Sequence, residues 1–318
     1  MKALRVNDSR VRLAEIQMPG KIGEALVRVI KSGICNTDLE IARGYAGFNG
    51  TIGHEFVGVV ENCEDAPDLV GKRVVGEINA GCGECALCMA GDPRHCPTRT
   101  VLGIHGRDGA HAEYLTLPSR NLISVPTDVS DESAVFAEPL AAAYGIAERV
   151  ELGSSDYVFV VGDGKLGLLA AFCASLNSSR VVLVGRHREK LALAESRGIE
   201  TISESEVGQF NKVADIVIEA SGSETGFTTA LDLVKPRGTI VLKSTFQGTS
   251  NWDVSRIVVN EISVVGSRCG RLAPAIELLA SKKVKVDDLI SKEFRLDDGV
   301  MALGQASEQG VLKVLLRP

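Results

Sequence analysis

The chain has no long hydrophobic run, and no stretch of its 318 residues approaches the roughly 20 apolar residues that a membrane-spanning helix needs. A secretory signal is also missing, because the first six residues, MKALRV, are those of a short amphipathic strand. These absences argue against a membrane protein and against export. The expected location is the cytoplasm, with an organelle left open in case a transit segment has been trimmed.

A long basic run is missing as well. Lysine and arginine number 35 against 41 aspartate and glutamate residues, which gives a formal net charge of -6 at pH 7. This balance argues against nucleic acid or an anionic membrane as a partner, so small soluble ligands are expected. Repeats and low-complexity segments are absent, and 45% hydrophobic and 24% charged residues are ordinary for a globular chain long enough for two domains.

The order of strand-like and helix-like segments changes along the chain. Up to about residue 80, short β-rich runs alternate with glycine turns, which predicts a compact all-β body. An alanine-rich helix is predicted over 134–149, and from 156 to about 266 strands alternate with helices, as in a parallel sheet covered on both faces. The strands predicted there are 157–161, 180–184, 214–219, 238–243 and 263–266, and a helix over 274–281 and a last strand over 311–316 follow.

A glycine-rich turn follows the first of these parallel strands. Gly162, Gly164 and Gly167 form the pattern G-x-G-x-x-G, with Lys165 and Leu166 before the last glycine. In such a turn the first glycine permits the tight bend, the second lets the backbone approach a pyrophosphate, and the third lets helix and strand pack closely. The motif alone is weak, but its place between two predicted parallel strands favours a dinucleotide site.

The end of the second parallel strand indicates which dinucleotide is bound. An NAD-binding unit places Asp or Glu there to bind the ribose hydroxyls, whereas this chain has Gly185 followed by Arg186. The missing acid removes the repulsion that a ribose phosphate would meet, and the arginine offers it a charged fork, which predicts NADP(H) in preference to NAD(H). The alternative is that Arg186, His187 and Arg188 only form the solvated start of a helix.

Four of the eight cysteines are crowded into one loop. Cys82, Cys85, Cys88 and Cys96 follow the pattern C-x-x-C-x-x-C, with seven residues before the fourth. Four thiolates at this spacing can close a tetrahedron around zinc and leave no position for a substrate, so a structural zinc site is predicted. An iron–sulfur cluster is the competing interpretation, and four free thiols in one loop is the least favoured.

Further residues of metal-ligand type are dispersed along the chain. Cys35 follows a predicted strand, His54 and Glu55 precede another, and Glu138 comes much later. Thiolate, imidazole and carboxylate are the ligands of a catalytic zinc that keeps one position for water or substrate. Each residue alone also has an ordinary explanation, as a small buried thiol, a hydrogen-bonded core histidine or a charge at a helix end.

Together, these segments resemble the zinc-dependent medium-chain dehydrogenase/reductase family over nearly the whole chain. The resemblance implies an α/β protein with a GroES-like β-rich catalytic domain, 1–140 completed by 267–318, and a Rossmann domain with a doubly wound parallel sheet, 141–266. The segments that match are Gly33-Ile34-Cys35-x-Thr37-Asp38, Gly53-His54-Glu55-x-x-Gly58, the four-cysteine loop, Asp108-Gly109-Ala110-x-Ala112-Glu113-Tyr114, Glu138-Pro139-Leu140 and the turn at Gly162.

The resemblance also implies roles for the dispersed residues. Cys35 and His54 match ligands of the catalytic zinc, and Glu55 matches a carboxylate that binds the metal directly or exchanges with water. Glu138 matches the acidic third protein ligand of the polyol and secondary-alcohol branches, and Thr37 lies where the family has its Ser/Thr proton relay. In that chemistry the metal lowers the pKa of the alcohol, and the alkoxide expels hydride to the nicotinamide.

On the cofactor side, Lys190 aligns with a basic residue near the adenosine ribose. Arg268 aligns with an arginine that binds polyol hydroxyls in the sorbitol dehydrogenase-like branch, although a surface ion pair explains it equally well. The resemblance places the nicotinamide contacts at Ser244, Thr245, Phe246, Ser267 and Arg268.

The sequence therefore predicts an NADP(H)-preferring enzyme with about two Zn²⁺ per chain, which interconverts an alcohol or polyol with its ketone or aldehyde. The alternatives are an NADPH-dependent reductase of a conjugated carbon–carbon double bond, which usually lacks the catalytic zinc, and a non-catalytic NADPH-binding protein of the same fold. A homodimer or homotetramer through the edge strands of 238–266 is expected. The short spacing between Cys35 and His54 implies trimmed loops, which leaves the substrate open.

Overall fold

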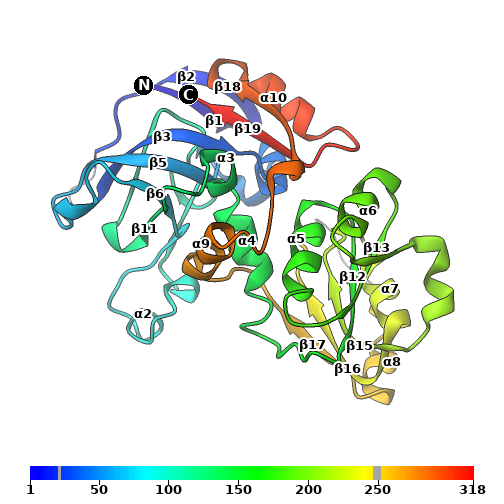
Figure 1. The fold of residues 1–318 in the computed structure, drawn as a ribbon. Coiled ribbons are helices and arrows are strands. Elements are labelled where there is room, and N and C mark those ends of the chain that lie inside the picture. Colours follow the sequence, from blue (N-terminus) through cyan, green and yellow to red (C-terminus); the bar gives the residue numbers. More distant parts are fainter. Residues whose placement is uncertain (21–22, 246–251) are drawn as a thin grey trace. The chain divides into compact units, whose positions relative to one another are not determined.

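The computed structural model describes residues 1–20, 23–245 and 252–318. The chain forms two compact units, one of Met1–Glu138 with Leu272–Pro318 and the other of Pro139–Arg271 (Figure 1). The boundaries expected from the sequence, at 140/141 and 266/267, stay a prediction of how the chain divides into domains. Within the described ranges, no helix has the length and apolarity of a membrane-crossing segment.

The first unit is built on a mixed sheet in which the last strand of the chain pairs with an early one. Within the described residues it has seven strands, and the last strand of the chain pairs antiparallel with the third, Leu315 opposite Gly33. The strand expected over 311–316 is therefore confirmed, and it returns to the first body. In spatial order the strands are β11 (Leu122–Ser124), β6 (Arg73–Gly76), β5 (Glu55–Asn62), β3 (Ala25–Gly33), β19 (Lys313–Arg317) and β18 (Ile290–Arg295), with β10 (Tyr114–Leu117) beside β3.

Strand β3 shows why this region forms a sheet with one buried face. Ala25, Val27 and Val29 are buried and alternate with partly or fully exposed residues. Because successive side chains of a strand point to opposite faces, this alternation turns one face into the core and leaves the other toward solvent. The buried face packs with Phe56, Leu117 and other apolar residues of the neighbouring strands.

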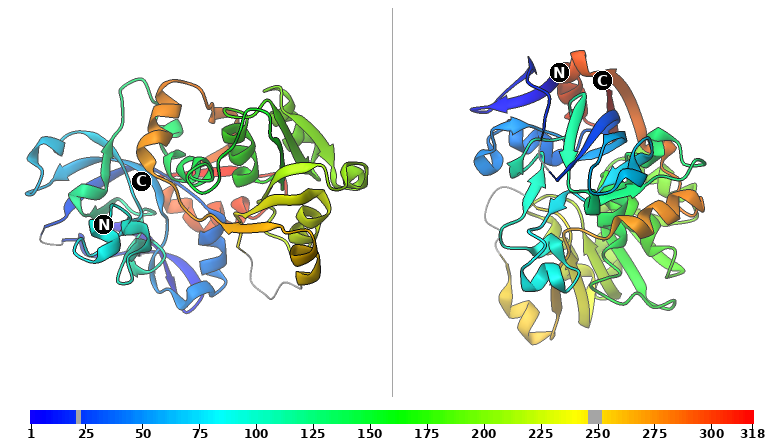
Figure 2. Two further views of the ribbon diagram at one scale, coloured as in Figure 1. Left: turned by 90° about the horizontal axis from the view of Figure 1, so that it is seen from below. Right: turned by 90° about the vertical axis from the view of Figure 1, so that its left-hand side faces the viewer.

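Smaller elements complete the first unit (Figure 2). The two further sheets are β2 (Arg10–Glu15), β1 (Lys2–Asn7) and β4 (Gly50–Thr51), and β7 (Asn79–Ala80), β8 (Thr100–Leu102) and β9 (Gly106–Arg107). The helices are α1 (Asn36–Ala42), α2 (Ala86–Met89), α3 (Asp131–Ala134), α9 (Leu272–Ala280) and α10 (Gly299–Ala306). Short 3₁₀ turns are η1 (Tyr45–Gly47), η2 (Pro67–Leu69), η3 (Pro93–His95), η4 (Ser119–Asn121), η6 (Asp287–Leu289) and η7 (Leu296–Asp298).

The second unit is a parallel sheet with helices packed along it (Figures 1 and 2). The near-continuous apolar run of the strand 157–161 is typical of a parallel strand that is covered on both faces. In order, the described strands are β14 (Glu200–Ser203), β13 (Arg180–Gly185), β12 (Tyr157–Val161), β15 (Ala214–Glu219), β16 (Val234–Leu242) and β17 (Ser263–Gly266). The helices are α5 (Lys165–Ala174), α6 (Arg188–Glu195), α7 (Gly226–Leu233) and α8 (Val254–Val259), with η5 at Glu204–Phe210.

The structure differs from the sequence-based expectation in several elements, and strand β18 and helices α1 and α10 are among those not predicted. The helix predicted over 134–149 is shorter, because α4 spans Ala137–Tyr144 and turns follow it. At Gly145 the chain passes so close to Gly270 that an added Cβ would lie 2.6 Å from its Cα. Strand β14 was not predicted either, because it has only four residues and most of them are partly or fully exposed.

Candidate active site

Cys35 lies at the junction of strand β3 and helix α1. Its backbone is extended at the helix N-cap, and its N–H donates to Oδ2 of Asp38 at 2.8 Å. This capping contact fixes the place where the thiol leaves the backbone. Thr37, half-buried in the first turn of α1, has its Oγ1 3.8 Å from the sulfur of Cys35. The local sequence thus sets a thiol and a hydroxyl side by side.

His54 and Glu55 reach the same place from the start of strand β5. One ligand atom of each residue lies within 4.8 Å of the others and of the Cys35 sulfur, and both side chains are buried. The structure therefore brings three of the predicted ligands together. Glu138, in the first turn of α4, lies outside this group.

A buried lysine holds Glu55. Lys313 Nζ, from strand β19, donates to Oε2 of Glu55, and it also lies 3.5 Å from the carbonyl oxygen of Ile34. The side chains of Lys313 and Glu55 are 0% and 1% exposed. The other carboxylate oxygen, Oε1, is buried without a hydrogen-bond partner. Because a buried acceptor is costly to leave unpaired, this oxygen beside a thiol and an imidazole fits a bound cation.

The carboxylate of Asp38 lies next to both Cys35 and His54. It is fully buried, and its Oδ1 lies 3.4 Å from Nδ1 of His54. Burial alone would raise the pKa of Asp38, but attraction to His54 and contacts with His111 and His54 hold it well below its ordinary value. For His54 the effects are reversed. Burial alone would lower its pKa, but attraction to Asp38 and Cys35 raises the pKa well above the ordinary value. A carboxylate thus lies beside the imidazole, where an outer partner commonly supports a metal-binding histidine.

The four-cysteine loop also converges. Ligand atoms of Cys82, Cys85, Cys88 and Cys96 all lie within 4.8 Å of one another, and none of the four forms a disulfide. Hydrogen bonds from Thr98 and the Cys82 N–H lower the pKa of Cys96 to about 6. The Gly83 backbone lowers the pKa of Cys88, but burial and the neighbouring thiols outweigh this and raise it to about 11. Four thiols this close ionise together only beside a cation, which fits a closed metal site.

The glycine turn of the second unit has the geometry that its motif predicts. Gly162 has φ +115, and an added Cβ would lie 2.7 Å from the Cα of Ser221. At Gly167 a Cβ would lie 1.9 Å from the carbonyl oxygen of Gly162, whereas at Gly164 nothing lies within 4 Å. The middle glycine is thus open to a ligand. Lys165 and Leu166 are half-buried in the first turn of α5, whose N-terminus has no side-chain cap.

An aspartate that the sequence interpretation passed over reaches the end of strand β13. Asp163 accepts hydrogen bonds from the N–H groups of Arg186 and His187, both at 2.7 Å, and from His187 Nδ1 at 3.0 Å. A Cβ at Gly185 would lie 2.6 Å from this carboxylate, so the glycine is required for the close approach. The carboxylate of Asp163 therefore already accepts hydrogen bonds from the turn after β13. The Arg186 side chain is 56% exposed and pairs with Glu204 at 2.7 Å.

The remaining residues predicted to bind the cofactor mostly follow other parallel strands. Ser244 Oγ donates to Glu219 at 2.5 Å and accepts from the Gly222 N–H at 3.0 Å. Lys243, also missed from the sequence, donates to the carbonyl oxygens of Ser267 and Arg268 at 3.2 and 2.8 Å. Thus the turns after β12, β13, β16 and β17 share the carboxyl edge of the sheet, where such folds bind ligands. Lys190 is buried on α6, Thr245 and Arg268 are exposed, and Phe246 lies outside the described residues.

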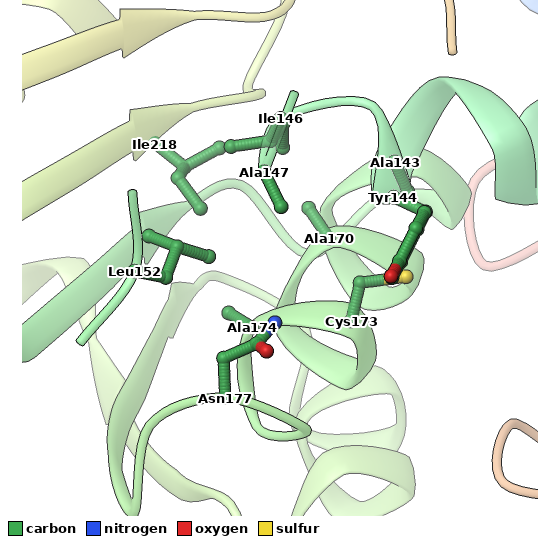
Figure 3. A pocket seen from close by; sticks show the side chains of 10 residues that line it. All are labelled: Ala143, Tyr144, Ile146, Ala147, Leu152, Ala170, Cys173, Ala174, Asn177 and Ile218. Carbon is green, nitrogen blue, oxygen red and sulfur yellow. The ribbon is translucent and has the colours of Figure 1, made fainter. Parts of the chain in front are cut away.

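The second unit also contains a small pocket that lies apart from the predicted site residues (Figure 3). It is almost entirely apolar and too narrow to admit a water molecule. None of the predicted site residues lines it, so we assign it to core packing. Its walls are Ala143, Tyr144, Ile146, Ala147, Leu152, Ala170, Cys173, Ala174, Asn177 and Ile218.

Comparison with known proteins identifies the family. An alcohol dehydrogenase GroES-like domain matches residues 21–127, and a zinc-binding dehydrogenase domain matches residues 166–281. A sorbitol dehydrogenase from Halalkalibacterium halodurans is 31% identical, over 94% of this chain and 93% of its own.

Two solved structures are similar over the full length. A zinc-binding dehydrogenase from Sinorhizobium meliloti 1021, bound to NADP, is 29% identical with a TM-score of 0.89, and the match covers 100% of this chain and 99% of that one. An alcohol dehydrogenase from Escherichia coli CFT073, in complex with NADH, is 28% identical with a TM-score of 0.92 and the same coverage. The family resemblance and the predicted fold class, a GroES-like domain with a Rossmann domain, are confirmed. The chain belongs to the zinc-type medium-chain dehydrogenase/reductase family.

Proposed function

We propose that the protein is a zinc-dependent dehydrogenase, which transfers hydride between an alcohol or polyol and a nicotinamide cofactor, with NADP(H) preferred. The observation that carries this proposal is the meeting of Cys35, His54 and Glu55 around one point, with Glu55 Oε1 buried and unpaired. A non-catalytic protein of this fold has no need of such a set. A reductase of conjugated carbon–carbon bonds has little use for it either.

Cys35 and His54 would hold the catalytic zinc, together with Glu55 or Glu138. Of the two carboxylates, Glu55 is favoured here because it belongs to the ligand group. Zinc at this point would lower the pKa of a bound alcohol. Thr37, next to the Cys35 sulfur, would accept and pass on the alcohol's proton. The four cysteines at 82, 85, 88 and 96 would hold a second, structural zinc.

In the second unit, Gly162, Gly164 and Gly167 would bind the pyrophosphate at the N-terminus of α5. Ser244, Thr245, Ser267 and Arg268 would contact the nicotinamide, which accepts the hydride, and Lys190 would lie near the adenosine ribose. Lys243 supports this proposal because it ties together the segments after β16 and β17.

The preference for NADP(H) depends on Gly185 and Arg186. The two solved relatives carry NADP and NADH, so the argument rests on this chain's own residues. Asp163 adds a negative charge near the turn, but two backbone N–H groups and His187 already compensate it. Arg186 is exposed, and its partner Glu204 would have to yield it to a ribose phosphate.

Replacing Arg186 with alanine is expected to weaken NADPH binding by roughly 1.5–3 kcal/mol, the range for a hydrogen bond to a charged group, and to leave NADH binding nearly unchanged. Fluorescence titration with both cofactors measures this. Arg188→Ala is the matched control, because Arg188 is 75% exposed two residues away and pairs with Glu195. Tighter binding of NADH than of NADPH by the unaltered protein would refute the preference.

The substrate is proposed to be hydroxylated. Support comes from Arg268 and from the similarity to a sorbitol dehydrogenase. A panel of polyols, secondary alcohols and aldehydes, assayed with both cofactors, tests this. Turnover of enones alone, with no oxidation of any alcohol, would favour the carbon–carbon reductase instead.

We also propose a homodimer or homotetramer formed through the second unit. Among the described strands, β17 is the last of its sheet, and the preceding helix α8 exposes Val258 and Val259 at 69% and 80%. Exposed valines beside an open sheet edge are typical of an association surface. Sedimentation of the unaltered protein should give at least a dimer, and Val258→Asp should reduce its mass. A monomer at micromolar concentration would contradict the proposal.

A further inference from the structure

His111 is a buried histidine that the family motif passes over, since it occupies the variable position between Ala110 and Ala112. It is 0% exposed, and its backbone N–H donates to the carbonyl oxygen of Ile52 at 2.9 Å. Its ring covers Gly53, where an added Cβ would lie 2.5 Å from Nδ1. The ring thus packs directly against the backbone that carries His54.

Both ring nitrogens of His111 face polar groups. Nδ1 lies 2.9 Å from Oγ of Ser32, and Nε2, which is buried and makes no hydrogen bond to any described residue, lies 3.4 Å from Oδ2 of Asp38. Because an ionised carboxylate repels a lone pair and attracts an N–H, this contact favours the tautomer with the proton on Nε2. Nδ1 then accepts from the hydroxyl of Ser32. The contacts therefore run from Ser32 through His111 to Asp38.

Asp38 in turn contacts two of the candidate metal ligands, Cys35 and His54. Its Oδ2 accepts the Cys35 N–H at 2.8 Å, while Oδ1 accepts the Gly53 N–H at 3.1 Å and lies 3.4 Å from Nδ1 of His54. One carboxylate thereby sets the backbone of the thiol ligand and the ring of the imidazole ligand. The orientation of this carboxylate decides whether both ligands meet the same cation.

We propose that His111 is a positioning residue of the catalytic metal site, which together with Ser32 fixes the carboxylate of Asp38 and through it orients His54 and Cys35. The inference rests on the proposed catalytic zinc. Among the described contacts, Nε2 of His111, 3.4 Å from Oδ2, is the side-chain nitrogen beside Asp38 that belongs to no candidate ligand. Without it, the carboxylate rotates more freely and the ligand pair is less well preorganised.

Metal affinity tests this inference directly. Zn²⁺ binding at the catalytic site is measured by competition with a chromogenic chelator, and Co²⁺ added to the same site reports its geometry by absorption, with Cys35→Ser as the spectral baseline. His111→Leu is expected to weaken binding about 10- to 100-fold, the range for the loss of an outer partner of a metal ligand, and to alter the cobalt spectrum. His111→Gln, whose amide N–H can still reach Asp38, should recover most of the affinity.

Two further variants separate positioning from packing. Leu115→Ala, in the buried core of the same unit, should lower the melting temperature but leave metal affinity unchanged. Ser32→Ala keeps the imidazole and should weaken binding by a few-fold, so it decides the matter if His111→Leu does not fold. Unchanged affinity and spectrum in His111→Leu and Ser32→Ala, or a His111→Gln variant no better than His111→Leu, would overturn the inference. Absence of a metal site at Cys35 in the unaltered protein would instead refute the proposed function.

Discussion

A Cys35→Ser or His54→Ala variant is expected to lose the catalytic zinc and turnover together while it keeps the zinc of the four-cysteine loop. The thiol and the imidazole meet at one point with Glu55, and removing either leaves too few ligands for a stable site. Zinc contributes several kcal/mol to stabilising the developing alkoxide charge, so alcohol oxidation should fall by at least about a thousandfold. Elemental analysis and a nicotinamide-linked assay on the same samples measure both losses.

Cys63→Ala is the matched control for the thiol. Cys63 is also buried in the first unit, but it packs within the apolar core and belongs to neither cysteine group. It should keep both zincs and full turnover. Activity that survived the loss of zinc in Cys35→Ser would rule out zinc catalysis.

Replacing Lys313 with methionine is expected to destabilise the protein by about 3–5 kcal/mol, the usual cost of breaking a buried ion pair. Lys313 and Glu55 are both buried, and within the described residues Lys313 is the cation that forms an ion pair with Glu55. Without it an uncompensated carboxylate lies in the core. Urea denaturation of metal-free protein measures the free energy of unfolding without a contribution from metal binding.

The double variant Lys313→Met/Glu55→Gln should recover a large part of this loss, because no buried charge is then left unpaired. Lys292→Met on the neighbouring strand β18 is the surface control and should change stability by less than about 0.5 kcal/mol. If Lys313→Met were as stable as the unaltered protein, Glu55 would not depend on Lys313.

The local parts of the site could be predicted from the sequence. The glycine turn, the four-cysteine loop and the two segments around Cys35 and His54 are short patterns, and each fixes its own geometry. The parallel strands were equally readable, because their continuous apolar runs differ from the alternation of the first unit. Strand β14 was missed since it is short and half-exposed.

The supporting residues could not be predicted, because their contacts join distant parts of the chain. Lys313 meets Glu55 only after β19 pairs with β3, a contact across 258 residues. Asp38 belongs to the family-like segment around Cys35, but the sequence does not show that it lies next to His54. His111 and Asp163 likewise gain their roles from close approach to Gly53 and Gly185.

Glu138 shows the opposite case. It was predicted as a ligand from its motif alone, whereas the structure groups Glu55 with Cys35 and His54. Its role as the third ligand stays a prediction. Metal content and affinity of Glu138→Gln and Glu55→Gln, compared side by side, would rank the two carboxylates.

The most direct test of the account is a stepwise chelation of the unaltered protein, with zinc content and alcohol dehydrogenase activity followed together. The account predicts about two zincs per chain, activity that disappears when the zinc held by Cys35 and His54 is removed, and recovery when Zn²⁺ is restored. Full turnover by protein that holds only the zinc of the four-cysteine loop would contradict it.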